Sequence, residues 1–125
     1  MTNENKVKEL QALGKTPKCS EVAKALMRMG DFKGDYDKIL DGLDGKWKAD
    51  GPSIFDIAVS EYLEAGNYNE LAALMTFLTR EDDGDPGAFA GRAKKGEIKK
   101  VIDRMIQLLQ SGNSTAARDR MISKQ

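Results

Sequence analysis

Apolar residues recur along this chain at three- and four-residue intervals, the spacing that places side chains on one face of an α-helix. Similar stripes lie within residues 19–29, 53–66 and 67–80. Val and Ile are few beside Leu, Ala, Lys and Glu, a composition that favours helices over strands. We therefore predict an all-α protein. Its strongest stripe comprises Ile98, Val101, Ile102, Met105, Leu108 and Leu109.

Glycines followed by capping residues separate several of these stripes, as at Gly30-Asp31 and Gly66-Asn67. Such pairs favour helix reversals, so we expect an irregular bundle of five to seven short helices arranged as αα-hairpins. The spacing between the pairs is not constant, which favours this bundle over its alternative, a helical-repeat scaffold with a concave binding face. Ser53 with Asp56 and Asn67 with Glu70 have capping-box spacing and predict two helix starts.

The segments between and beside the stripes complete the expected layout of one domain spanning residues 1–125. Residues 1–15 hold only three apolar residues at helical spacing and predict a loosely held N-terminal helix. Asp-Gly dipeptides predict a turn-rich loop over residues 44–52. Residues 81–87 predict an acidic turn that follows a helix ending near Arg80, and residues 113–125 a short C-terminal helix or tail.

Charge is balanced in total but not along the chain. The 20 basic and 20 acidic side chains sum to zero, which argues against a uniformly basic nucleic-acid binder and against an acidic tail protein. Residues 51–85 nevertheless carry a net charge of −7 and residues 86–125 a net charge of +6, by count from the sequence. Either the two blocks neutralise one another within the monomer or an oligomer, or the basic block stays exposed for an acidic partner or a polyanion.

The basic block contains the candidate binding residues Arg92, Lys94, Lys95, Lys99, Lys100 and Arg104. If one helix ran through Gly96, Arg92, Lys95 and Lys99 would share an outer face while the apolar stripe packed inward. Cations of this kind contact phosphates with little sequence readout. Trp47, set between two lysines, is a further candidate that could stack on a base or bind a protein partner, although such a residue more often fixes a loop to the core.

Catalytic and metal-binding chemistry has little support in the sequence. The chain has no histidine and one cysteine, Cys19, so the usual components of catalytic triads, zinc sites and disulfides are missing. The acidic residues at 81–87 are too few and in the wrong register for an EF-hand calcium loop. We expect no catalytic residues, no metal, no cofactor and no small-molecule substrate. A lone thiol and the lack of an apolar segment of membrane-spanning length predict a cytoplasmic protein with no membrane contact.

These observations favour a non-catalytic protein–protein interaction, regulatory or assembly protein. It would act through helical surfaces and through its segregated acidic and basic blocks, on a protein partner or by self-association into a homo-oligomer. The alternative is a nucleic-acid-binding protein that uses residues 92–104. No stretch of the sequence identifies the partner.

Overall fold

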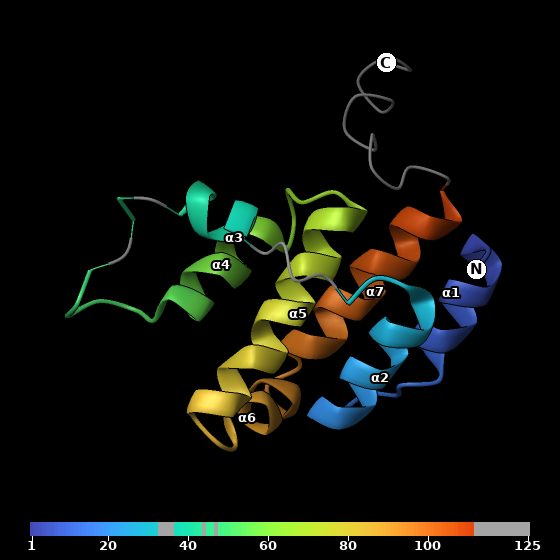
Figure 1. Ribbon diagram of the computed structural model, residues 1–125, viewed down its shortest axis with the longest axis horizontal. Coiled ribbons are helices and arrows are strands. Elements are labelled where there is room, and N and C mark those ends of the chain that lie inside the picture. Colours follow the sequence, from blue (N-terminus) through green and yellow to red (C-terminus); the bar gives the residue numbers. More distant parts are fainter. Residues whose placement is uncertain (33–36, 44, 47, 112–125) are drawn as a thin grey trace, which may run out of the picture.

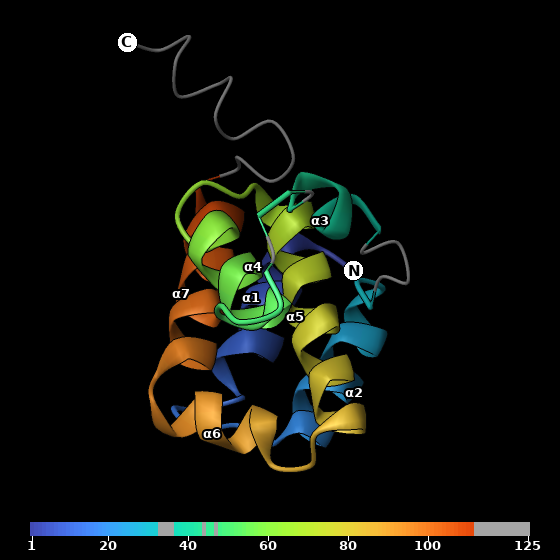
Figure 2. The ribbon, with the colours of Figure 1, turned by 90° about the vertical axis from the view of Figure 1, so that its left-hand side faces the viewer.

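The structure of this chain is a computed structural model that describes residues 1–32, 37–43, 45–46 and 48–111. The described residues form an irregular all-helical bundle with no strand, as the spacing of apolar residues predicted (Figure 1; Figure 2). The arrangement as αα-hairpins stays a prediction. The seven helices are α1 (Asn3–Gln11), α2 (Cys19–Met29), α3 (Asp37–Gly42), α4 (Ile54–Tyr62), α5 (Tyr68–Gly84), α6 (Ala88–Lys94) and α7 (Glu97–Gln110).

Helix α5 is the centre of the bundle. It runs the length of the molecule, with α3 near one end and α6 at the other, and it contacts α2, α4 and α7 along its sides (Figure 1; Figure 2). Residues 71–79 are all buried, whereas the sequence indicated a single apolar stripe. A helix enclosed on every side buries its polar positions too. Buried hydroxyls need hydrogen-bond partners, and those of Thr76 and Thr79 find them within the helix. They donate to the carbonyl oxygens of Ala72 and Thr76, at 2.9 and 2.6 Å.

Two capping positions act as the sequence predicted. The Ser53 side chain accepts a hydrogen bond from the N–H of Asp56 at the start of α4. At the start of α5, Asn67 and Glu70 each accept from the other's backbone N–H at 2.9 Å, a reciprocal capping box. These bonds satisfy backbone donors that have no partner inside the helix, so they fix where both helices begin.

The acidic segment 81–87 is partly helical, which corrects the predicted turn. Helix α5 continues to Gly84, so only residues 85–87 lie between helices. Acidic side chains in a last helical turn oppose the helix dipole, but here they have partners that the sequence did not reveal. Glu81 pairs with Arg92, and Asp82 accepts hydrogen bonds from the N–H groups of Gly87 and Phe89, both at 3.1 Å.

Helix α1 packs against α7 and α2, and its apolar residues Val7 and Leu10 are buried. Two ion pairs add to this contact. Arg28 of α2 lies 2.8 Å from Glu9, and Lys6 lies 2.9 Å from Asp31, which follows α2. The helix is therefore bound by more than the apolar stripe that the sequence shows.

The structure describes only part of the loop predicted over residues 44–52 and none of the predicted segment 113–125. The described residues of the loop predicted over 44–52 lie outside helices, while Trp47 and residues 113–125 are outside the described part of the chain. Among the described helices, none is long and apolar enough to cross a membrane.

Asp31 and Tyr68 form a buried polar contact where α1, α2 and α5 meet. The Tyr68 hydroxyl donates to Asp31 at 2.7 Å, and Lys6 lies over the Tyr68 ring as well as beside the Asp31 carboxylate. Burial and the hydrogen bond to Asp31 raise the pKa of the Tyr68 phenol well above its ordinary range. The hydroxyl is therefore protonated at neutral pH and donates to Asp31.

Tyr68→Phe should lower the free energy of unfolding by about 1–2 kcal/mol, because it leaves a buried carboxylate oxygen without this donor. Urea unfolding followed by circular dichroism measures the change. Tyr62→Phe is the matched control: Tyr62 is half-buried and donates no hydrogen bond within the described residues, so it should change stability by less than about 0.5 kcal/mol. Equal effects of the two variants would contradict a stabilising role for the Asp31 contact.

Candidate interaction surface on helices α6 and α7

The basic segment does not form one helical face. Gly96 has a φ of +83°, in the left-handed region, and this conformation separates α6 from α7. The condition under which Arg92, Lys95 and Lys99 would share an outer face is therefore not met. Glycine adopts this conformation without the steric cost that a Cβ imposes, so the break lies at the one residue of the segment suited to it.

Arg92 lies inside the molecule, in contrast to the exposed position that the sequence suggested. Its side chain is 9% exposed, and its guanidinium contacts carboxylates from three other helices. Nε and Nη2 donate to the two oxygens of Glu81 in α5, at 2.6 and 2.8 Å. Nη1 donates to Glu97 in α7 at 3.0 Å, and Nη2 lies 2.8 Å from Asp56 in α4. Arg92 is therefore not a surface cation for a partner.

The protonation of this cluster follows from its geometry. Hydrogen bonds to Glu81, opposed by burial and reinforced by Glu97 and Asp56, raise the pKa of Arg92 further above its ordinary value. Burial by itself would raise the pKa of Asp56, but the bonds from Arg92 and Ser53 outweigh burial and lower it. The cluster is thus a structural ion-pair network in which one guanidinium contacts three carboxylates.

The remaining basic residues differ in exposure. Lys94, Lys95 and Lys100 are exposed and form no ion pair with the described residues. Lys99 pairs with Asp103, one turn further along α7. Arg104 is half-buried; it donates to the side chain of Gln107 at 2.9 Å and to the carbonyl oxygen of Glu64 at 3.4 Å, and its buried Nε has no partner among the described residues.

The acidic block, by contrast, is largely satisfied from within. Asp56 and Glu81 pair with Arg92, Glu61 pairs with Lys46, and Asp83 lies 3.7 Å from Arg80. Two further members, Glu70 and Asp82, accept hydrogen bonds from backbone N–H groups. Only one residue of the basic segment, Arg92, takes part in this neutralisation. Within the described residues, one side chain therefore pairs the two blocks, and Lys94, Lys95 and Lys100 are exposed.

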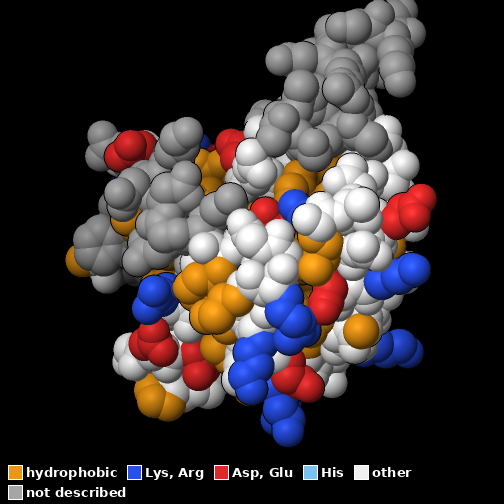
Figure 3. Space-filling model, turned by 45° about the vertical axis from the view of Figure 1, so that its right-hand side comes forward, with side chains coloured by type: hydrophobic (Ala, Val, Ile, Leu, Met, Phe, Trp, Pro, Cys, Tyr) orange, Lys and Arg blue, Asp and Glu red, His pale blue; other side chains and the backbone are white. Residues whose placement is uncertain are grey.

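Two of the exposed lysines of this segment line separate grooves. Lys94 lines a groove of 540 Å³ between α6 and the start of α2, where it is joined by Lys18. Lys100 and Arg104 line a second groove of 290 Å³ between α7 and the residues that follow α4. On the face shown in Figure 3, Lys and Arg side chains gather in the lower part, with acidic side chains among them. The cationic surface is therefore mixed and divided, where the sequence suggested a continuous run.

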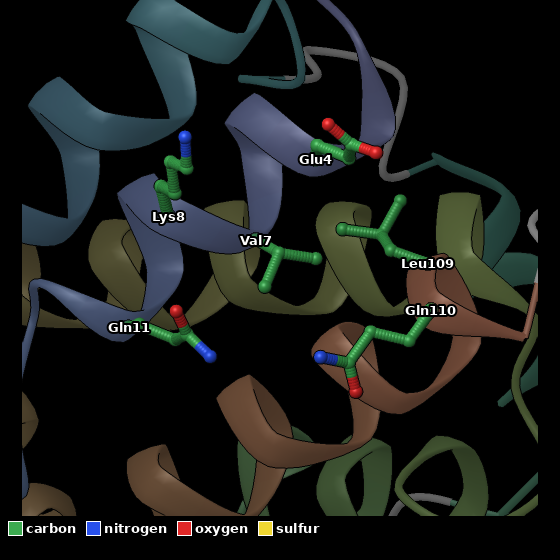
Figure 4. Close-up of a pocket in the computed structure, with 6 residues that line it drawn as sticks. All are labelled: Glu4, Val7, Lys8, Gln11, Leu109 and Gln110. Carbon is green, nitrogen blue, oxygen red and sulfur yellow. The ribbon is translucent and has the colours of Figure 1, made fainter.

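A third groove lies between α1 and α7, and its residues are shown in Figure 4. Val7 and Leu109 form its apolar part, and Glu4, Lys8, Gln11 and Gln110 surround them. Val7 is only 8% exposed and Leu109 only 3%, because the two helices already cover them. Little apolar surface is left there for a ligand to bury.

Sequence reasoning missed Lys18. It belongs to the nearly neutral first part of the chain and precedes a helix whose stripe indicates only core packing. It shares a groove with Lys94 because the fold places the start of α2 on one side of that groove and α6 on the other. No spacing in the sequence signals a neighbour so distant along the chain.

No protein-family model, curated protein or solved structure matches this chain. Among the described residues, no three His, Cys, Asp or Glu side chains gather in a way that could hold a metal ion. The surface geometry is therefore the main support for a function.

Arg92→Ala should lower the free energy of unfolding by about 3–5 kcal/mol, because it leaves Glu81 buried without its cation. Lys94→Ala, a neighbouring exposed change in the same helix, should alter stability by less than about 0.5 kcal/mol. Both are measured by urea unfolding. Combining Arg92→Met with Glu81→Leu should recover most of the loss, since apolar side chains can replace a buried ion pair. An Arg92→Ala protein within about 1 kcal/mol of wild type would contradict this role.

Proposed function

We propose that this chain is a non-catalytic interaction protein, a regulatory or assembly component, that presents the lysines of α6 and α7 to an acidic protein partner. One observation carries the proposal. Lys94, Lys95 and Lys100 are exposed without ion-pair partners among the described residues, whereas Glu81, Glu97 and Asp103 are engaged internally. Unsatisfied charge of one sign on a surface attracts and orients a partner of the opposite sign.

The polar groups inside the molecule support the non-catalytic part of the proposal. Arg92 and Asp31 are each engaged by neighbouring side chains at hydrogen-bond distance. Burial raises the pKa of Cys19, and the charges of Asp82 and Asp83 raise it further. A thiol with a raised pKa is protonated at neutral pH and is a weak nucleophile.

The proposal includes self-association, in which the acidic partner is a second copy of this chain. Glu64 and Asp85 are exposed acids of the 51–85 block, so a second copy of the chain offers carboxylates as well as lysines. We place the interaction in the cytoplasm, because the lone thiol fits a reducing compartment. The oligomeric mass from light scattering shows whether the partner is a second copy.

Nucleic-acid binding is the second candidate, supported by the same three unpaired lysines together with Lys99. Arg92 gives it no support, since its donors are occupied, and Arg104 has two of its nitrogens engaged by Gln107 and Glu64. Phosphate contacts by the lysines would give affinity that falls steeply as salt rises.

Exchanging Lys94, Lys95 and Lys100 for Glu should abolish the capture of protein partners from an extract of the source cell by the tagged chain. The matched control exchanges three other exposed lysines, Lys8, Lys24 and Lys48, for Glu, with the same change in net charge. Mass spectrometry compares the proteins bound by each variant. Partners bound equally by both variants, or no partner and no self-association in the wild type, would overturn the proposal.

Nucleic-acid binding is tested by measuring the affinity of the wild type and of the two triple variants for duplex and single-stranded DNA over a salt series. If nucleic acid is the ligand, the wild type should bind at low salt with a linear fall of log affinity against log salt, and the Lys94, Lys95 and Lys100 variant should lose that binding. The absence of binding by the wild type at low salt excludes nucleic-acid binding through these lysines.

A further inference from the structure

The groove between the start of α2 and α6 combines an apolar wall with two lysines. Its volume, 540 Å³, lies within the range of pockets that bind small ligands or inserted side chains. Pro17 and Ala93 in its wall are buried, and Cys19 and Ala90 are partly or fully exposed beside them. Cys19 and Ala90 therefore supply the apolar surface that one side chain of a partner can contact.

The charges around this groove favour an anionic occupant. Lys18 and Lys94 are exposed, and neither has an ion-pair partner among the described residues. Asp82 also lines the groove, but its Oδ1 accepts two backbone N–H groups, and Asp83 beside it is turned to Arg80. The two lysines outnumber the one carboxylate of the lining, so the groove carries a net positive charge that favours an anionic ligand.

From this juxtaposition we propose that the groove docks a short acidic segment of a partner protein, with one apolar side chain against Cys19 and Ala90 and flanking carboxylates at Lys18 and Lys94. The inference rests on the proposed function and gives it a place and a partner chemistry. An apolar anchor set in a pocket supplies most of the affinity of such contacts, and the surrounding charges supply orientation and specificity.

The lining of the groove favours a peptide over nucleic acid. Sites for unpaired nucleotides stack bases on aromatic side chains, and the lining contains none. A phosphate backbone also needs a continuous track of cations, whereas this lining has only two lysines and includes the carboxylate of Asp82. A carboxylate–apolar–carboxylate segment matches both features of the site.

The test is a titration of the ¹⁵N-labelled full chain with a capped peptide, Asp-Glu-Leu-Leu-Glu-Asp, followed by NMR. The amide signals of Ser20, Ala90, Ala93 and Lys94 should shift together and saturate. Alkylation of Cys19 by N-ethylmaleimide gives an independent readout, because the thiol lies in the groove wall. At a peptide concentration ten times the dissociation constant, the alkylation rate should fall about tenfold.

Matched controls separate this groove from general attraction to lysine. Lys18→Glu with Lys94→Glu should weaken the peptide at least about tenfold, while Lys8→Glu with Lys48→Glu, which makes the same change in net charge, should leave the affinity within about twofold. Peptides with Lys in place of the acids, or with Ala in place of both Leu residues, should not saturate the site. Inorganic phosphate and an oligothymidylate serve as the anion and nucleic-acid probes.

Several results would overturn the inference. They are NMR shifts spread over lysines throughout the molecule, equal binding of the lysine peptide, no loss of peptide affinity in the Lys18 and Lys94 variant, or saturation of the site by phosphate or oligothymidylate alone.

The two proposals can fail separately. If the Lys18→Glu variant still captures the partner that the Lys94, Lys95 and Lys100 variant loses, the partner does not dock in the groove and the proposed function stands. If the wild type captures no partner and does not self-associate, yet binds the acidic peptide at the predicted amides, the groove holds and the proposed function fails.

Discussion

The guanidinium of Arg92 holds together the half of the molecule that carries the exposed lysines. It contacts Asp56 in α4, Glu81 in α5 and Glu97 in α7 from its own position in α6, so one side chain joins four helices. Only arginine has enough donors, in a planar fork, to satisfy three carboxylates at once. This network fixes α6 against the end of α5 and the beginning of α7. The lysines that follow Arg92 are consequently held at defined positions, which a flexible basic tail would not provide.

The same network explains how balanced total charge coexists with an uneven surface. Carboxylates of the acidic block are drawn to Arg92, Arg80 and Lys46 or to free backbone N–H groups. Lys94, Lys95 and Lys100 have no such partners in the described part of the chain, and an ammonium group on a long flexible stem remains hydrated at little cost. Most described acids of the 51–85 block are thus neutralised or hydrogen-bonded inside the fold, whereas Lys94, Lys95 and Lys100 are left to solvent or a partner.

Local features of the fold were predictable because they depend on neighbouring residues. The stripe from Ile98 to Leu109 is the buried face of α7, and Ser53 and Asn67 cap the helices that follow them. The end of α5 was not predictable, since Glu81 and Asp82 are stabilised by partners in α6 and in the connection before it. The sequence predicted Arg92 on the surface, but its partners in three other helices hold it inside. Trp47, a further candidate, lies outside the described residues.

By itself, the sequence determined the helical class, several helix boundaries and the separation of charge into blocks, because periodicity, capping and composition act over a few residues. The tertiary structure decided which charges are satisfied. It turned Arg92 inward, engaged most of the acidic block and placed Lys18 and Lys94 in the lining of one groove. Whether an ion is paired depends on distance and burial, and packing sets both between residues far apart in the chain.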